Sequence, residues 1–275
     1  MADLSISKAW DETKATLASD GTLLMTVAAA LFLLPQVLVG VATGAGADAA
    51  QSPPALGLPM AIAALIGLVG QISIAWLAIG SSVSVGEAIR HGLRRLLPFL
   101  GAILLVVATM ALIFILAALI LMVAGVIDRP LAGVEPRPRD IAMVLLVALV
   151  PMLFVSVRLI PTSAVAAAET VGAVGILKRS WQLTRGHFPR LLGFMAIFIV
   201  GMLVVIVAVG PIIGLLAIAL FGSTEPFSLG ALTIALVTAL IQAAVVVVYV
   251  VMVARIYVQL AGDRSAEATV PISGT

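Results

Sequence analysis

Long uncharged blocks alternate with short charged segments along this chain. The blocks cover residues 21–47, 49–86, 96–127, 141–157, 191–224 and 226–254. A helix needs ~20 mostly apolar residues to cross a ~30 Å hydrocarbon layer, and a charged side chain at its centre costs several kcal/mol. The pattern therefore predicts an all-α polytopic membrane bundle with six transmembrane helices.

The limits of the blocks give the expected bounds of the spans. These are residues 23–42, 58–79, 99–126, 141–160, 191–220 and 232–259. The third and fifth spans are longer than a bilayer requires, and Gly210-Pro211 predicts a kink or a re-entrant break in the fifth. We expect residues 1–262 to form one six-span membrane domain and residues 263–275 to form a short flexible cytoplasmic tail.

Composition agrees with this class of protein. Apolar residues make up 63% of the chain and charged residues 10%, whereas soluble domains have ~45–50% and ~25%. The sequence contains no cysteine, which excludes a disulfide or a thiolate metal site within it.

The positions of Lys and Arg predict the orientation. Residues 87–98 hold three arginines, residues 170–190 hold one lysine and three arginines, and further bases flank the first and last spans. The positive-inside rule then places both termini in the cytoplasm. Residues 1–20 hold as many as four acids, so a membrane span is favoured over a cleavable signal peptide for the first block. With both termini in the cytoplasm, three arginines are expected on the opposite side of the membrane: Arg129, Arg137 and Arg139.

The chain contains a weak threefold repeat. Residues 8–14 (Lys-Ala-Trp-Asp-Glu-Thr-Lys) match residues 179–185 (Arg-Ser-Trp-Gln-Leu-Thr-Arg), and residues 89–93 form a fainter copy. Each copy precedes a pair of spans. We therefore expect three units, each an interfacial amphipathic helix followed by a transmembrane hairpin. The alternative is that basic segments before spans look alike through composition alone.

The expected interfacial helices lie near residues 4–18, 84–96 and 172–186. Ser84 and Glu87 form a capping box at the start of the second, and Pro98 suits the first turn of the span that follows. Gly186 is expected to end the third helix, and Pro189 to begin the fifth span.

Such helices lie in the headgroup layer with their cations outward. The side chains expected to contact lipid or to anchor the protein are Trp10, Arg90, Arg94, Arg95, Lys178, Arg179, Trp181 and Arg185. The expected partners are anionic lipid headgroups of the inner leaflet and a protein partner or a second copy of this chain. Nucleic acid is not an expected partner.

Polar residues inside spans are pointers to function. Arg158 and Glu169 would share one helix face if the helix continued past Pro161; otherwise each needs a different partner. Arginines near span ends also snorkel to headgroups, which is the alternative interpretation. The candidates within or at the ends of spans are Gln71, Arg158, Glu169, Gln242 and Arg255.

Two spacings of glycine allow close helix approach, Gly40-x-x-x-Gly44 and Gly210-x-x-x-Gly214. His91 and His187 stand without a carboxylate or a second histidine at ligand spacing. Nucleotide-binding, serine-hydrolase and metalloprotease motifs are missing. We therefore expect no catalytic residue, no cofactor and no metal site.

The segment from Arg158 to Gly193 carries a family resemblance. Arg158, Glu169 and the run Ile-Leu-Lys-Arg-Ser-Trp-Gln-Leu-Thr-Arg-Gly-His-Phe at residues 176–188 resemble the bacterial glycerophosphoryl diester phosphodiesterase membrane-domain family. The resemblance implies a six-span fold and a bacterial cytoplasmic membrane. It does not imply phosphodiesterase activity, because the catalytic barrel of the name-giving members has no counterpart in this sequence.

Three functions remain to be distinguished. The sequence favours a non-enzymatic membrane module that engages anionic lipid or a partner protein through its basic face. The alternative is a transporter or permease for a small solute or a lipid, which a polar cavity at mid-membrane would favour and a dry, aliphatic interior would weaken. A membrane-embedded enzyme ranks last, since no acids or histidines cluster at one interface.

Overall fold

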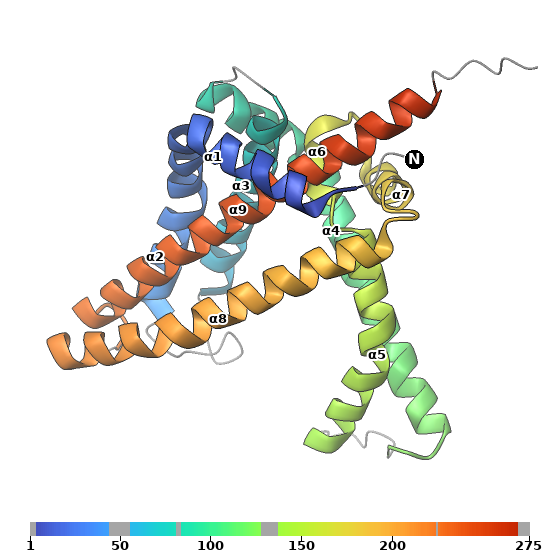
Figure 1. Cartoon of the computed structure of the whole chain (residues 1–275). Coiled ribbons are helices and arrows are strands. Elements are labelled where there is room, and N and C mark those ends of the chain that lie inside the picture. Colours follow the sequence, from blue (N-terminus) through green and yellow to red (C-terminus); the bar gives the residue numbers. More distant parts are fainter. Residues whose placement is uncertain (1–3, 44–55, 81–83, 128–136, 224, 269–275) are drawn as a thin grey trace, which may run out of the picture.

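The described part of the chain is built from helices. The computed structural model describes residues 4–43, 56–80, 84–127, 137–223 and 225–268 (Figure 1). Within these residues there is no strand, and six helices are long and apolar enough to cross a membrane. The prediction of an all-α polytopic bundle is confirmed.

The helices follow the uncharged blocks in order. They are α1 (Ile6–Ala28), a π-helical turn η1 (Ala29–Leu33), α2 (Leu34–Thr43), α3 (Gly57–Ile79), α4 (Val85–Val123), α5 (Pro138–Arg158), α6 (Thr162–Ala168), α7 (Ala173–Leu183), α8 (Phe188–Phe221) and α9 (Leu229–Ala268). Of the expected tail, residues up to Ala268 continue α9, and the residues beyond it lie outside the described part.

The three predicted hairpins are present as packed pairs. The chain from α1 to α2 packs against α3, α4 packs against α5, and α8 packs against α9. α9 also contacts α1 and α2, so the last helix closes the bundle against the first. In Figure 1 the α4–α5 hairpin leads away from the other helices, and a small core of its own, around Ala117, Val144 and Ala148, holds it together.

The short helix α6 is the centre of the main core. Its residues Thr162 to Ala167 are all buried, and it contacts α3, α4, α7 and α9. Only small side chains fit where four helices converge, and this helix consists of Thr, Ser, Ala and one Val. The pattern of the sequence does not reveal this helix.

Two of the three expected interfacial segments continue as one helix into the span that follows. The first runs without interruption into the first span, and the second runs into the third span as the single helix α4. Pro98 lies inside α4, where its ring removes one backbone hydrogen bond but does not end the helix. The third interfacial helix is separate, as expected: Gly186 has a φ of 91° after α7, and Pro189 lies in the first turn of α8.

The predicted re-entrant break at Gly210-Pro211 is wrong, because α8 is continuous through Pro211. A Cβ added to Gly210 or Gly214 would meet no neighbouring atom within 4 Å, so these glycines mediate no close approach. Gly40 does: a Cβ there would lie 2.8 Å from the Ala235 Cβ on α9. Gly44 lies outside the described residues.

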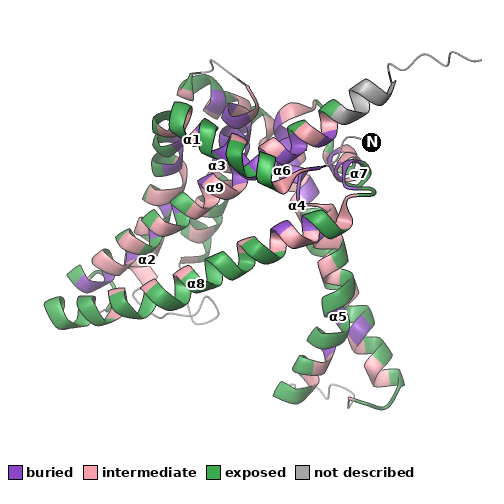
Figure 2. Ribbon diagram, viewed as in Figure 1, coloured by how far each residue is buried: buried purple, intermediate pink, exposed green. Residues whose placement is uncertain are grey.

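Large aliphatic side chains cover the outside of the spans. Figure 2 shows α8 and the α4–α5 hairpin as mostly exposed, and the exposed side chains there are Leu, Ile and Val for the most part. A soluble protein rarely shows an apolar surface of this extent, whereas a bilayer is the solvent it suits. The described helices therefore form a multi-pass membrane bundle.

Candidate functional site

Most of the predicted site residues gather at one end of the bundle, which we call the α7 end. It comprises α6, α7, the first turns of α1 and α4, and the last turns of α5 and α9. Contacts of α7 with α4, α6 and α9 hold it together, as does the pairing of α1 with α9. The predicted residues found here are Trp10, Arg90, Arg94, Arg95, Arg158, Glu169, Lys178, Arg179, Trp181, Arg185 and Arg255.

Glu169 connects three elements of this end. It follows α6, and its Oε1 accepts a hydrogen bond from Arg179 Nε of α7 at 2.8 Å and one from the Tyr257 hydroxyl of α9 at 3.0 Å. Because α5 ends at Arg158 and the chain turns before α6, Arg158 and Glu169 do not share a helix. The partner of Glu169 is therefore Arg179, not Arg158, and Tyr257 is a third member that the sequence did not reveal.

Arg158 lies between two aromatic rings. Its Cζ is 5.3 Å from the centroid of Phe154, one turn earlier on α5, and 5.5 Å from the centroid of Trp181 on α7. Its Nε and Nη1 are buried and have no hydrogen-bond partner among the described residues. The cation thus has ring faces beside it but no acceptor for these two donors.

Arg255 links α9 to α1. Its Nε and Nη2 donate to the Thr16 Oγ1 at 3.0 Å and 2.6 Å, and the Thr16 hydroxyl donates to the Glu12 carbonyl. A further contact lies beside it, from the Ser5 amide to Gln259 Oε1 at 3.4 Å. Arg255 therefore has a structural partner in Thr16.

The exposed cations concentrate on α4 and α7. Arg90 and Arg94 on α4 and Lys178 and Arg185 at α7 are exposed, and none of the four has an ion pair among the described residues. On α1, by comparison, Lys8 faces Glu12 at 3.9 Å and Lys14 faces Asp11 at 2.8 Å. The basic surface is thus formed by α4 and α7, since acids neutralise the bases of α1.

Arg95 and Arg179 differ from these four. Both are half-buried; Arg179 is paired with Glu169, and Arg95 has a buried Nη2 with no partner in the described part of the chain. Trp10 on α1 and Trp181 on α7 expose 44% and 40% of their surface. Rings of this kind suit the headgroup layer.

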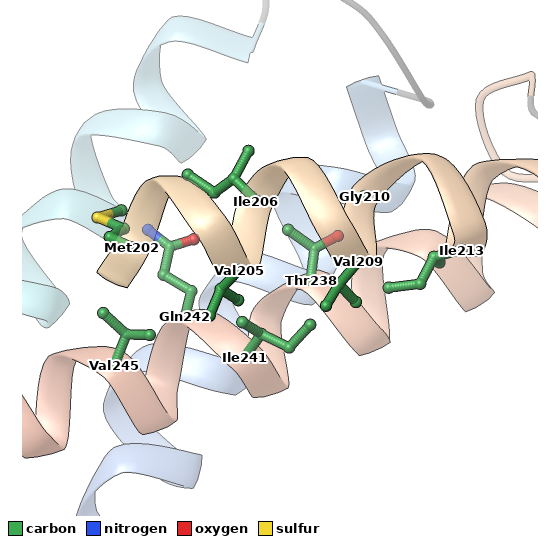
Figure 3. A pocket seen from close by; sticks show the side chains of 10 residues that line it. All are labelled: Met202, Val205, Ile206, Val209, Gly210, Ile213, Thr238, Ile241, Gln242 and Val245. Carbon is green, nitrogen blue, oxygen red and sulfur yellow. The ribbon is translucent and has the colours of Figure 1, made fainter. Parts of the chain in front are cut away.

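The two glutamines lie on α3 and α9. Gln71 is half-buried on α3. Gln242 projects from α9 toward α8 into a cavity of about 230 Å³ (Figure 3). Apart from Gln242 and Thr238, the side chains that line this cavity are apolar.

His91 takes part in the packing of the α7 end, which the sequence analysis missed. Its ring stacks on Trp76 of α3 with centroids 4.0 Å apart, and its Nε2 lies 2.8 Å from the Ala167 carbonyl oxygen at the end of α6. An acceptor at this distance assigns a proton to Nε2. His91 thereby ties α4 to the buried helix.

The chain matches one family model. A model described as a domain of unknown function (DUF7847) matches residues 4–260. No curated protein and no solved structure matches. The resemblance to the phosphodiesterase membrane-domain family stays a prediction.

Proposed function

We propose that this chain, which belongs to the DUF7847 family, is a non-enzymatic membrane module that binds anionic lipid through the cationic surface of its α7 end. The supporting observation is the exposure of Lys178 and Arg185 at α7 without ion pairs in the described part, beside the half-exposed ring of Trp181. We assign this end to the cytoplasmic side, following the positive-inside rule. The family resemblance adds the expectation that the membrane is a bacterial cytoplasmic membrane.

The build of α7 supports this proposal. Ile176 and Leu183 are buried against the bundle, so the helix is fixed at the α7 end with its cations turned outward. Each Lys or Arg near an anionic leaflet contributes ~1 kcal/mol of attraction. Lys178 on α7 and Arg185 in the turn after it, with Arg90 and Arg94 on α4, therefore attract anionic lipid together.

The alternative function, transport, has the cavity between α8 and α9 as its supporting observation. The cavity holds one carboxamide, from Gln242, and one hydroxyl, from Thr238. Passage of a hydrated solute depends on hydrogen-bonding groups along its path, and the other residues that line this cavity are apolar. The cavity thus suits an apolar chain, which favours the lipid-binding module.

The test is a double charge reversal, Lys178→Glu with Arg185→Glu. Arg179 is left unchanged, because reversing it would break its ion pair with Glu169 and unsettle the fold. The variant should retain about tenfold less anionic lipid after mild detergent extraction, as loss of two attractive charges and gain of two repulsive ones act in the same direction. Native mass spectrometry of the extracted protein measures the retained lipid.

The matched control is Arg139→Glu in the first turn of α5. Arg139 is also exposed, but it lies at the opposite end of α5 from Arg158. Its reversal should leave the retained anionic lipid unchanged. Equal lipid retention by the double variant and the wild type would refute the proposed function.

A further inference from the structure

Three buried polar groups have no partner in the described part of the chain, and the residues that carry them are joined to Thr184 through their backbone atoms. The groups are Nε and Nη1 of Arg158, Oγ of Ser180 and Nδ1 of His187, each unpartnered among the described residues. The Thr184 hydroxyl donates toward the Arg158 carbonyl oxygen at 3.1 Å. Its amide donates to the Ser180 carbonyl oxygen at 3.1 Å, and its own carbonyl accepts from the His187 amide at 3.2 Å. Thr184 thus connects the ends of α5 and α7 with the start of α8.

The aromatic rings beside Arg158 stabilise its positive charge but offer no hydrogen-bond acceptor to its N–H groups. The rings of Phe154 and Trp181 attract the cation, yet the N–H groups of a guanidinium point outward in its plane and need acceptors. A buried donor left without an acceptor is destabilising, more so when it is charged. The nearest carboxylate that the sequence offered, Glu169, already accepts from Arg179 and Tyr257.

An anion with several oxygens would supply the acceptors that Arg158 lacks. A guanidinium binds phosphate with two parallel N–H donors, which a point charge such as a Lys ammonium does not provide. Ser180 adds a hydroxyl that can donate a further hydrogen bond, and its Oγ has no partner within the described residues. These groups match the chemistry of one phosphate.

We propose that Arg158 and Ser180 form a specific site for a single phosphate group, that of one lipid headgroup, with His187 beside it. This deepens the proposed function and rests on it, because the exposed cations of α7 concentrate anionic lipid at this end. The source of the phosphate is expected to be a lipid, because the two rings that cover Arg158 lie on the outer surface of the bundle. Phe154 and Trp181 expose 39% and 40% of their surface on the outside of the bundle, so rotation of either ring opens the guanidinium toward the bilayer.

The experiment compares lipid retention by three variants in the full-length protein. Arg158→Gln removes the charge, Arg158→Lys keeps the charge but not the planar fork, and Ser180→Ala removes one donor. Native mass spectrometry at rising collision energy should show one phospholipid held by the wild type after all others have left. Its occupancy should fall about tenfold or more in both Arg158 variants and a few-fold in Ser180→Ala.

Ser180→Ala keeps the test decisive if the Arg158 variants fail to fold, since the Ser180 Oγ forms no hydrogen bond within the described residues that its loss could break. Arg139→Gln, at the other end of α5, is the matched control and should keep the lipid. Unchanged occupancy in Ser180→Ala and in any folded Arg158 variant would overturn the proposal.

Two further arms identify the source of the phosphate. Delipidated protein is titrated with inorganic phosphate and with phosphatidylglycerol in nanodiscs. Arg158-dependent binding of phosphatidylglycerol supports the site, whereas Arg158-dependent binding of inorganic phosphate alone, or of a second protein chain in its place, overturns it.

The outcome also separates this inference from the proposed function. In one outcome, the double variant Lys178→Glu with Arg185→Glu lowers total anionic lipid while Arg158→Gln keeps the last bound lipid. That result would support lipid binding by the exposed cations and refute the phosphate site at Arg158. If only the Arg158 variants lose lipid, the proposal that the exposed cations bind lipid is refuted.

Discussion

At the scale of single residues, one carboxylate oxygen acts as a junction. Oε1 of Glu169 accepts from Arg179 at 2.8 Å and from Tyr257 at 3.0 Å, and so joins α6 to α7 and to α9. Both partners are partly shielded from water, which makes a charge-assisted hydrogen bond stronger than an exposed ion pair. The position of the third interfacial helix therefore depends on Glu169.

Replacement of this carboxylate should loosen the α7 end. Glu169→Ala leaves a half-buried guanidinium and a phenol without their acceptor, and should lower the free energy of unfolding by about 1–3 kcal/mol. Tyr257→Phe removes one neutral donor and should cost about 1 kcal/mol or less. Thermal unfolding in detergent measures both, and a variant Glu169→Ala as stable as the wild type would contradict the junction.

Sequence reasoning identified Glu169 and Arg158 but not their surroundings. Their rarity in an apolar chain marked them, since intramembrane charges are costly. Their partners depend on where α5 ends, and the turn at residues 159–161 decides that. A pattern of polarity carries no information on a turn between two helices of the same character, so Arg179, Tyr257 and Thr184 could not be assigned as partners.

At the scale of helices, α3 and α4 approach each other more closely than the sequence indicated. A Cβ on Gly92 of α4 would lie 2.5 Å from the Ser73 Oγ and 2.8 Å from the Val69 carbonyl oxygen of α3. The Ser73 hydroxyl donates within α3 to Val69 at 2.7 Å and lies 3.1 Å from the Ala88 carbonyl oxygen of α4. Small residues and a hydroxyl thus hold the two helices together, as is common in membranes.

Gly92→Ala tests this contact. Because the backbone of α3 has to move, the substitution should destabilise the protein by about 1–3 kcal/mol. Gly86→Ala in the same helix is the control: nothing lies within 4 Å of its Cβ position, and Ala favours a helix over Gly. The midpoint of thermal aggregation, followed by size-exclusion chromatography, should fall for Gly92→Ala and hold or rise for Gly86→Ala.

The sequence predicts that the six membrane-spanning helices exist, but it predicts less well the residues at which they begin and end. Length and apolar content determine a span, and each of the six uncharged blocks contributes to one helix long and apolar enough to cross a membrane. The boundary between an interfacial helix and a span needs a residue that ends the helix, and neither Gly21 nor Pro98 does so here. Gly186 does, because it adopts the left-handed region after α7. The small buried helix α6 is too short for a periodicity to reveal it.

At the scale of the whole molecule, the ends of the helices predict how the bundle lies in its membrane. The α7 end holds Lys178, and the first turn of α5 at the other end holds Arg139; both side chains are exposed. The chain contains no cysteine, so a single introduced thiol reports one position. Its accessibility on either side of a membrane then gives the orientation.

We expect Arg139→Cys to react with a membrane-impermeant maleimide on intact cells, and Lys178→Cys to react only after permeabilisation. The positive-inside rule assigns the α7 end to the cytoplasm and gives this result. Labelling of Lys178→Cys on intact cells, with Arg139→Cys protected, would reverse the orientation and remove anionic inner-leaflet lipid as a partner.

The pairing of α1 with α9 has a consequence for biogenesis. Thr16 of α1 is buried, and Arg255 of α9 donates to its hydroxyl. During translation α1 lacks its contact with α9 until the ribosome has completed the final span. A chain that stops before residue 229 lacks that contact altogether, so quality-control proteases should recognise it through the same polar residue that a finished protein conceals.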